Sequence, residues 1–354
     1  MSAVTNRRVT IKQVAKEAGV STQTVSRVVN ERTDVATETR QRVLTVIERL
    51  GYQPNAIARS LIQRRSFTLG VVTAGLDYVG PSRTLNGITS NAEVLGYTLV
   101  LKELREFSGY DINRILDDLL ARQVDGIIWA VTEMGDNRDG FAERLSTLPV
   151  PVVFLTMRDR PGLNIVTVDN RLGGRLATQH LLDLGHKVIG HISGPRDWWE
   201  ARRRKQAWCL ALDEAGLTDG DELCVEGNWS SESGGQAIAK LLGRRPDISA
   251  VFVGNDQMAL GVLLYAHENN LRVPQHLAIV GFDGIPEAEY FWPPLATIEQ
   301  DQHELGCVAV SELVEIIEAR NTESAIEEPK TIRLQPKLIP RASSVSTLSN
   351  NHQQ

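Results

Sequence analysis

A short stretch near the amino terminus carries side chains that can hydrogen-bond the edges of DNA bases. Its outward positions supply hydroxyl, amide and guanidinium groups, at Thr22, Gln23, Ser26, Arg27 and Asn30. In the major groove arginine pairs with guanine, glutamine with adenine, and hydroxyl groups with several base edges. For this pattern alone, the alternative is an ordinary helical hairpin with a solvated polar face.

Two short helices with a tight break must hold these side chains. Thr10 and Gln13 have the spacing of a capping box, Gly19 ends the first helix, and Ser21 can cap the second. Apolar residues recur at helical intervals on the opposite side, at Val14, Ala15, Ala18, Val25, Val28 and Val29. A polar face backed by such an apolar edge is typical of a helix that enters the major groove.

A third helix and a short linker are predicted next. The helix runs from about Thr37 to Leu50, with an apolar face at Val43, Leu44, Ile47 and Leu50. The segment NAIARSLIQRR, residues 55–65, follows Pro54 and is too short to be a stable helix alone. We expect a linker that becomes helical when a partner holds it.

Charge is unevenly distributed along the chain. Residues 1–66 carry twelve Lys and Arg against five Asp and Glu, which gives this head a charge of +7. The net charge of the chain is −6, so the remainder carries −13. A basic head on an acidic body favours a polyanionic partner at one end only.

Composition excludes several classes of protein. The 354 residues are 42% apolar and 23% charged, as in a soluble globular protein of two or three domains. There is no membrane-length apolar run and no signal region, so we expect a cytoplasmic protein. The three cysteines lack paired spacing and are expected to be buried thiols. No nucleotide, metal or hydrolase motif occurs, so neither a cofactor nor an enzyme is expected.

From Phe67 onward the pattern changes to alternating strands and helices. Strand-like runs cover residues 68–73, 97–101, 125–131, 150–155, 188–193, 250–254 and 278–282, with helices between them such as 83–95, 113–122, 171–184 and 201–215. This alternation predicts an α/β body with doubly wound parallel sheets. Its length favours two subdomains with a cleft, and ligands bind beyond the carboxyl ends of such strands.

The loops that follow four of these strands combine small residues with hydrogen-bonding groups. They are Thr73–Gly75, Ser193–Pro195, Gly254–Asp256 and Gly281–Gly284. Tryptophans gather in the same part of the chain, and aromatic faces beside planar polar groups suit a sugar ring. We expect Trp198 and Trp199 to be partly exposed in a loop, whereas Trp208 is expected in the core.

The head resembles the DNA-binding domain of the lactose-repressor family of bacterial transcription regulators. VSTQTVSRVVN, the GYQPN turn and NAIARSL carry the resemblance. It implies base recognition by Thr22, Gln23 and Arg27, phosphate contacts near Ser21 and Asn30, and a hinge helix that inserts Leu61 into the minor groove. The complete set of expected DNA contacts is Thr10, Ser21, Thr22, Gln23, Ser26, Arg27, Asn30, Asn55, Ala58, Arg59 and Leu61.

The second half resembles the effector domain of the same family, which is itself similar to periplasmic sugar-binding proteins. ISGPRDWWEARRRKQAW, GNWSSESGG, FVGNDQMALG, IVGFDG and FWPPLATIEQD carry this likeness. The resemblance implies effector contacts from Arg204, Asn255 and Asp283. The complete expected set is Ala74, Asp197, Trp198, Trp199, Arg204, Trp229, Asn255 and Asp283. Departures from the family pattern at Thr156, Ala207, Gly284 and Gln302 leave the identity of the sugar open.

The expected organisation has four parts. A helix-turn-helix domain covers residues 1–53, a hinge helix 54–66, a two-subdomain effector and dimerisation body 67–341, and a disordered tail 342–354. One subdomain is expected to combine residues 67–166 with 296–325, and the other to combine 167–295 with 326–341.

Together these patterns predict a homodimeric, nucleoid-associated repressor of carbohydrate-utilisation genes. A mono- or disaccharide in the cleft, such as a β-galactoside, would release it from a pseudo-palindromic operator, and no membrane partner is expected. Two alternatives stay open: a regulator that answers a non-sugar or corepressor ligand such as a purine, and a sugar-binding protein without gene control.

Overall fold

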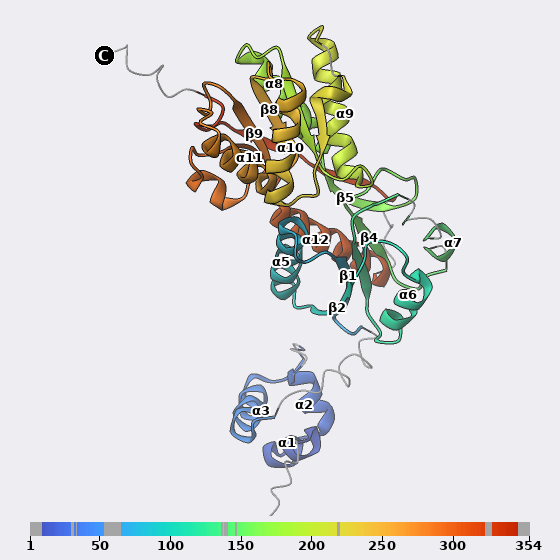
Figure 1. The fold of residues 1–354 in the computed structure, drawn as a ribbon. Helices are drawn as coiled ribbons and strands as arrows, with labels where there is room; N and C mark the ends of the chain where they lie inside the picture. The colour runs from blue at the N-terminus through green and yellow to red at the C-terminus, as the bar shows by residue number, and fades with distance from the viewer. Residues whose placement is uncertain are drawn as a thin grey trace, which may run out of the picture. The chain divides into compact units, whose positions relative to one another are not determined.

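The computed structural model describes residues 9–29, 32, 34–52, 65–135, 137, 141–145, 147–217, 220–322 and 328–345 (Figure 1). The chain forms two compact units, a small helical head within residues 1–67 and a larger body within residues 68–354. The division agrees with the predicted change of pattern at Phe67. None of the described helices combines the length and hydropathy that a membrane-spanning helix requires.

The head contains helices α1 (Ile11–Ala18), α2 (Thr22–Val29) and α3 (Thr37–Leu50). The predicted caps are present: the Thr10 amide donates to Gln13 Oε1 over 2.8 Å, and the Thr24 amide donates to Ser21 Oγ over 3.0 Å. Gly19 ends α1 in the left-handed conformation, with φ of 64°. These local signals explain why the observed helix bounds agree with the predicted ones.

A small apolar core joins the three head helices, through Val14, Ala15, Ala18, Val25, Val28, Val43 and Val46. One prediction for α3 was wrong, because Leu44 is 44% exposed while Val46 is buried. The helix is therefore rotated slightly from the expected orientation, and Ile47, Leu50 and Tyr52 pack only at the edge of the core.

The body is built on two six-stranded sheets, each covered by helices (Figure 1). The first has the order β11-β5-β4-β3-β1-β2, with β1 Thr68–Ala74, β2 Thr98–Leu104, β3 Gly126–Ala130, β4 Val152–Leu155, β5 Asn164–Val168 and β11 Thr331–Leu334. The second has the order β12-β10-β9-β8-β6-β7, with β6 Ile189–Ser193, β7 Cys224–Glu226, β8 Ala250–Val253, β9 Ala278–Asp283, β10 Ala296–Glu299 and β12 Lys337–Ile339. Among these strands only the β10–β12 pair is antiparallel.

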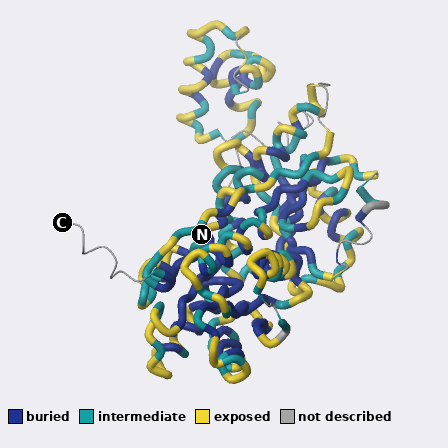
Figure 2. The backbone as a smooth tube through the Cα atoms, turned by 90° about the horizontal axis from the view of Figure 1, so that it is seen from above, coloured by how far each residue is buried: buried dark blue, intermediate teal, exposed yellow. Residues whose placement is uncertain are grey.

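The helices cover the two sheets in separate groups. The first half contains α5 Val79–Val94, α6 Ile112–Leu120, α7 Phe141–Leu145 and α12 Gln302–Asn321. The second contains α8 Asn170–Asp183, α9 Trp199–Glu214, α10 Ser231–Arg244 and α11 Asp256–Glu268, with 3₁₀ turns η1 Asp221–Leu223 and η2 Pro286–Tyr290. The buried residues lie in the interior of the body and the exposed ones at its surface (Figure 2). Most of the central strands are buried, as in β1, β4, β8 and β9, whereas the edge strand β2 is largely exposed. The predicted doubly wound architecture is confirmed.

The expected division of the carboxyl-terminal segments between the two halves was wrong at two strands. Strand β10 pairs in parallel with β9 and so belongs to the second sheet, although residues 296–325 were expected in the first. Strand β11 pairs in parallel with β5 and so belongs to the first sheet, although residues 326–341 were expected in the second. The chain therefore crosses between the halves three times: after β5, after β10 and after β11.

The body also extends beyond the predicted end at residue 341. Ser343 is fully buried: its amide donates to the Pro294 carbonyl over 2.9 Å, and its hydroxyl donates to the Ile279 carbonyl over 2.7 Å. Residues 342–345 are thus part of the second half rather than a disordered tail, and residues 346–354 lie outside the described part. Cys224 is buried as expected, whereas Cys209 and Cys307 are partly exposed.

Candidate functional site

The outward face of α2 carries the predicted base-reading side chains. Thr22, Gln23 and Arg27 are exposed, and Ser26 is half-buried. The guanidinium of Arg27 lies 3.5 Å from the carboxylate of Asp34, and both side chains are about half exposed. Such a surface ion pair is weak, so it does not prevent Arg27 from pairing with a base.

Other predicted DNA contacts have a different placement or lie outside the described residues. Ser21 and Thr10 are the caps of α2 and α1, and both are exposed. Asn30, Asn55, Ala58, Arg59 and Leu61 fall among the residues that are not described. Of the predicted hinge helix only Arg65 and Ser66 are described, and these two residues are not helical.

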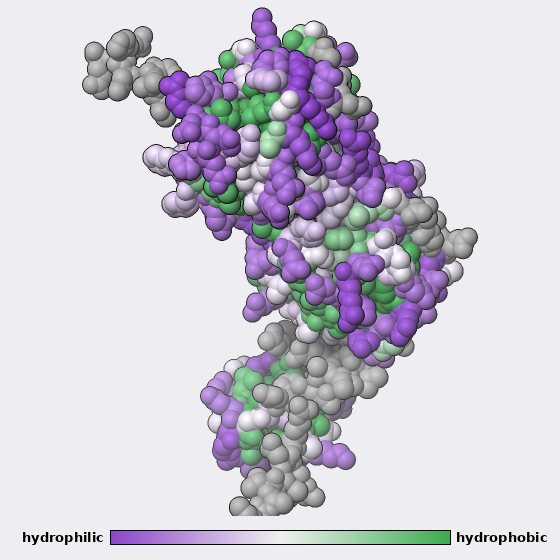
Figure 3. All heavy atoms as spheres, viewed as in Figure 1, coloured by the Kyte–Doolittle hydropathy of each residue, from purple (hydrophilic) through white to green (hydrophobic). Residues whose placement is uncertain are grey.

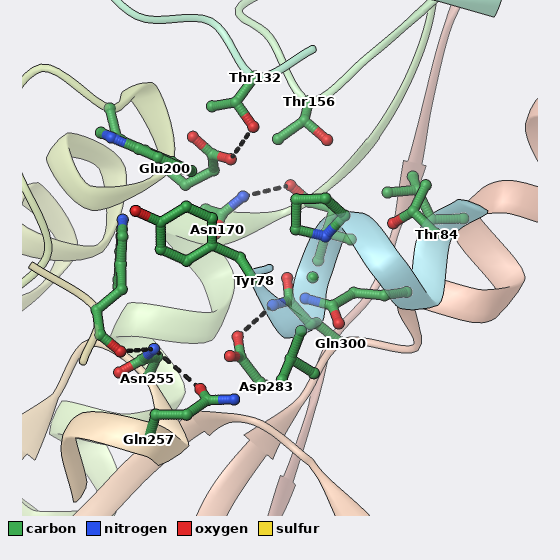
Figure 4. A pocket seen from close by; sticks show the side chains of 18 of the residues that line it. Tyr78, Thr84, Thr132, Thr156, Asn170, Glu200, Asn255, Gln257, Asp283 and Gln300 are labelled. Atoms are coloured by element: carbon green, nitrogen blue, oxygen red, sulfur yellow. Dashed lines mark hydrogen bonds between the residues drawn. The ribbon is translucent and has the colours of Figure 1, made fainter. Parts of the chain in front are cut away.

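A second candidate site lies in the body, in a cavity of about 440 Å³ at the carboxyl ends of the parallel strands. This is the position at which doubly wound sheets bind ligands. Side chains from both halves converge on it, and most of them are amides, hydroxyls and carboxylates (Figure 4). Five predicted effector contacts line the cavity: Trp198, Arg204, Trp229, Asn255 and Asp283.

Arg204 is fixed in the wall of this cavity by four neighbours. Its Nε donates to Asn170 Oδ1 over 2.8 Å, and its Nη1 donates to the Gly254 carbonyl over 2.6 Å. The guanidinium lies 3.8 Å from Asp283 and 3.7 Å from the centre of the Phe282 ring. Burial lowers the pKa of Arg204, and the charge of Asp283 opposes this effect. The side chain is therefore held in one orientation.

Two buried carboxyl groups, of Asp256 and Asp283, lie at the carboxyl ends of the neighbouring strands β8 and β9. Gln300 Nε2 donates to Asp283 Oδ1 over 2.6 Å, and the Thr297 hydroxyl donates to Asp256 Oδ1 over 2.7 Å. Burial raises the pKa of Asp283 to about 6, while Arg204 acts in the opposite direction. Burial, and then the charge of Asp283, raises the pKa of Asp256. Asp283 lines the cavity, and Asp256 supports the loop behind it.

Asn255 connects the polar wall to an aromatic one. Its Nδ2 donates to the Trp229 carbonyl and to Gln257 Oε1, each over 3.0 Å, and its Oδ1 caps α11 by accepting from the Met258 amide over 2.9 Å. The rings of Trp229 and Trp198 meet edge to face with centroids 5.6 Å apart. Tyr78 packs on Trp198 at the same distance from the first half. The cavity thus combines aromatic faces with amides in fixed positions.

The expected partial exposure of the adjacent tryptophans was wrong. Trp198 is 8% exposed and Trp199 is 9% exposed, because both lie at the start of α9 and pack against the body. The Trp199 amide donates to the Glu133 carbonyl, and Met134 forms a β-bridge with Trp198, so this segment joins the two halves. Trp208 lies in the core as predicted.

Three of the predicted effector residues do not line the cavity. Ala74 is buried at the end of β1, and Trp199 lies in a separate groove on the outer side of α9. Asp197 is exposed, and its carbonyl accepts from the Gly135 amide over 3.2 Å. The consecutive residues Asp197, Trp198 and Trp199 therefore lie at the protein surface, in the cavity and in the separate groove, respectively.

Several cavity residues were missed from the sequence. The main ones are Thr132, Asn170, Glu200, Gln257 and Gln300. The Thr132 hydroxyl donates to Glu200 Oε1 over 3.3 Å and so joins the two halves across the cavity. Asn170 and Gln300 lie where the chain crosses between the halves: Asn170 begins α8 two residues after β5, and Gln300 directly follows β10. A polar side chain just beyond the end of a predicted strand is the sequence signal that could have predicted both residues.

Comparison with known proteins agrees with this geometry. Residues 10–55 match the family model "Bacterial regulatory proteins, lacI family", and residues 178–344 match "Periplasmic binding protein-like domain". The chain is 36% identical to the ribose operon repressor of Escherichia coli (strain K12), over 94% of this chain and 99% of that protein. The chain belongs to the lacI family of bacterial regulatory proteins.

Two further lacI-family matches cover nearly the whole chain. The transcriptional repressor PurR of Proteus mirabilis (strain HI4320) is 34% identical, over 94% of this chain and 96% of that protein. The lac repressor dimer bound to operator and the anti-inducer ONPF superposes with a TM-score of 0.83 at 32% identity, covering 96% and 100% of the two chains. The resemblance, the fold class and the function as a DNA-binding transcriptional regulator are therefore confirmed. The family is one of regulatory proteins rather than enzymes.

Proposed function

We propose that this lacI-family regulator represses carbohydrate-utilisation genes and leaves its operator when a sugar binds the body cavity. It acts in the cytoplasm, on the chromosome, as a homodimer on a pseudo-palindromic site. The exposed face of α2 reads bases in the major groove, with Thr22, Gln23 and Arg27 in contact. The segment around Leu61 enters the minor groove as an apolar wedge.

The composition of the cavity carries the sugar assignment. A pyranose presents vicinal hydroxyl groups at its edge and C–H groups on its faces. Asp283, Asn255 and Arg204 supply planar acceptors and donors for the hydroxyls, and all three side chains are held by neighbours. Trp198 and Trp229 supply the apolar faces. A volume of about 440 Å³ accommodates a mono- or disaccharide.

The proposed response is a linkage between cavity and head. Sugar contacts both halves of the body and so favours one arrangement of the halves, while operator-bound heads require another. A coupling free energy of about 1–3 kcal/mol changes operator affinity roughly 5- to 150-fold. Thr132 and Glu200, which hydrogen-bond across the cavity, belong to the contacts that such a ligand would rearrange.

Fluorescence anisotropy with labelled DNA from upstream of its own gene tests this proposal. We expect tight binding without ligand and release by a monosaccharide or a disaccharide such as a β-galactoside. Scrambled DNA of the same length is the control for nonspecific attraction by the basic head. Tight binding that no member of a sugar panel changes would overturn the sugar assignment.

Identity alone does not select the effector, because the ribose operon repressor and PurR are about equally similar to this chain. A corepressor such as a purine is therefore the second candidate. Adding hypoxanthine and guanine to the same assay distinguishes the two. Tighter operator binding with a purine, and no effect of sugars, would identify a corepressed regulator.

A further inference from the structure

The cavity of about 440 Å³ described above is called the effector cavity below. A second recess, which shares none of its lining residues, lies on the outer side of α9. It has a volume of about 450 Å³ and is formed by three segments. Arg158 comes from the loop after β4 in the first half. Ser193 ends β6 and is followed by Gly194 and Arg196, and the third wall is the outer face of α9. We call this recess the α9 groove. In Figure 3 the surface around α9 is strongly hydrophilic.

The α9 groove is lined by five basic side chains and by no acidic one: Arg158, Arg196, Arg202, Arg203 and Lys205. Arg158 and Arg196 have carboxylate partners. Arg158 Nε lies 3.0 Å from Glu133, and Arg196 Nε lies 3.2 Å from Glu226. No described carboxylate pairs with Arg202 or Arg203, so their charges are not compensated by the described part of the protein.

These two arginines are nevertheless held in position. Arg202 Nη1 donates to the carbonyl oxygens of Arg196 and Asp197, over 3.0 and 2.8 Å. Arg203 Nη1 donates to Gln206 Oε1 over 3.0 Å, and its guanidinium lies 5.8 Å from the centre of the Trp199 ring. Arg202 and Arg203 thus bring two positive charges to one groove, and an anion bound there would lower the electrostatic cost of their repulsion.

Neutral hydrogen-bonding groups in the wall of the groove also lack partners. Ser193 Oγ and Trp199 Nε1 are buried and make no hydrogen bond among the described residues. Leaving a buried donor unsatisfied costs about 1–3 kcal/mol, and a ligand oxygen that reached either atom would relieve this cost. Both residues line the groove rather than the effector cavity.

We propose that the α9 groove is a second ligand site that binds a small anion carrying more than one phosphate. Guanidinium groups bind phosphate oxygens in pairs, and Arg158 lines the groove from the loop after β4 while Arg202 and Arg203 line it from α9. A simple solvated helix face would lack the recess and the contribution of Arg158 from the first half. Because the arginines come from both halves, a bound anion stabilises the arrangement seen here.

The groove and the effector cavity share a wall. Trp198 lines the cavity, whereas the next residue, Trp199, lines the groove. In the same way Arg204 lines the cavity, whereas its chain neighbours Arg203 and Lys205 line the groove. Helix α9 thus presents opposite faces to the two sites. Occupation of one site can therefore affect the other through a single rigid element.

Titration of the full-length protein with pyrophosphate at constant ionic strength tests the proposal. All six tryptophans lie outside the basic head, so their fluorescence reports binding to the body alone. We expect a saturable change, with affinity for pyrophosphate greater than for inorganic phosphate. The double variant Arg202→Ala/Arg203→Ala should weaken this binding at least tenfold.

The double variant Lys240→Ala/Arg244→Ala is the matched control, since both residues are exposed on α10. It removes the same charge and should bind pyrophosphate like the wild type. No saturable signal at millimolar pyrophosphate, or an equal loss in both double variants, overturns the proposal. So would binding of random-sequence DNA that depends on Arg202 and Arg203 without any binding of pyrophosphate. Neither sugar nor operator enters this test, so its outcome is independent of the proposed repression.

Discussion

The guanidinium of Arg204 lies 3.8 Å from the carboxylate of Asp283 in the wall of the effector cavity. Both side chains are more than nine-tenths buried, and neither charge would be stable there alone. Gln300 donates to one oxygen of Asp283, and Asn170 accepts from Nε of Arg204. Each charged group therefore keeps only part of its hydrogen-bonding capacity for a ligand. The pair therefore offers a donor and an acceptor side by side, which matches two neighbouring hydroxyl groups.

The variant Asp283→Asn should lose the response to effector while retaining operator binding. An amide keeps the shape but removes the charge that accepts a hydroxyl, and a hydrogen bond to a charged group contributes about 1.5–3 kcal/mol. We expect effector affinity to fall roughly 10- to 100-fold in calorimetric titration. Asp247→Asn is the control, because that carboxylate is exposed and pairs with Arg245. A variant still released from DNA by wild-type concentrations of sugar would exclude the proposed contact.

The variant Arg27→Ala should weaken specific operator binding by about 1–3 kcal/mol, because a bidentate contact to a base is lost. Lys16→Ala is the comparison, since Lys16 is an exposed cation on α1 in the same head. Anisotropy should show a much smaller loss for Lys16→Ala and a relaxed base preference only for Arg27→Ala. Equal losses on operator and scrambled DNA in both variants would contradict base reading by Arg27.

The head was predictable from sequence because its structure follows from local signals. The Thr10–Gln13 and Ser21–Thr24 spacings define the helix starts, and they are satisfied by hydrogen bonds within three residues. The orientation of α3 was harder, because Val46 and Leu44 are both apolar and only the packing of three helices selects between them.

The body was predictable as an architecture but not in its connections. Strands β10, β11 and β12 have four, four and three residues, too few for a periodic pattern to reveal them. Their sheet is decided by pairing with strands distant in the chain, such as β11 with β5. Asn170 and Gln300 were missed for the same reason, since they lie on the segments that cross between the halves. Trp199 was expected beside Trp198 at the cavity because the sequence does not say which side of α9 faces it, and in the structure Trp199 lines the groove instead.

The buried residue His191 should make the body sensitive to acid. Its ring lies between Trp208 and Phe252, with centroids 5.5 and 4.7 Å away, and its Nδ1 contacts the Phe252 carbonyl over 2.9 Å. Burial lowers the pKa of His191 from 6.5 to about 3, so the unfolded chain binds the proton more readily. The stability that this neutral group contributes is present above pH 6.5 and is lost as the pH falls toward 3.

Urea unfolding followed by tryptophan fluorescence measures this effect. Between pH 7 and pH 4 we expect His191 to account for a loss of about 3 kcal/mol in the free energy of unfolding. His191→Phe should reduce the slope over this range, whereas His267→Phe, at an exposed site on α11, should not. Identical slopes for wild type and His191→Phe would show that the histidine is not the acid-sensitive group.

Gly194 lines the α9 groove and packs against Trp229, which lines the effector cavity. The absence of a side chain at Gly194 leaves the space that the Trp229 ring occupies. A Cβ at this position would lie 2.0 Å from Cη2 of Trp229, so any side chain must displace the indole that lines the cavity. We expect Gly194→Ala to destabilise the body by about 1–3 kcal/mol, as overpacking of a core does, and to weaken effector binding as Trp229 moves.

Gly243→Ala is the matched control, because a Cβ there meets nothing within 4 Å and the site is in α10. That variant should gain about 0.5–1 kcal/mol from helix propensity. Thermal unfolding and calorimetric titration of both variants decide the matter, and Gly194→Ala with unchanged stability and effector affinity would show that Trp229 is free to move.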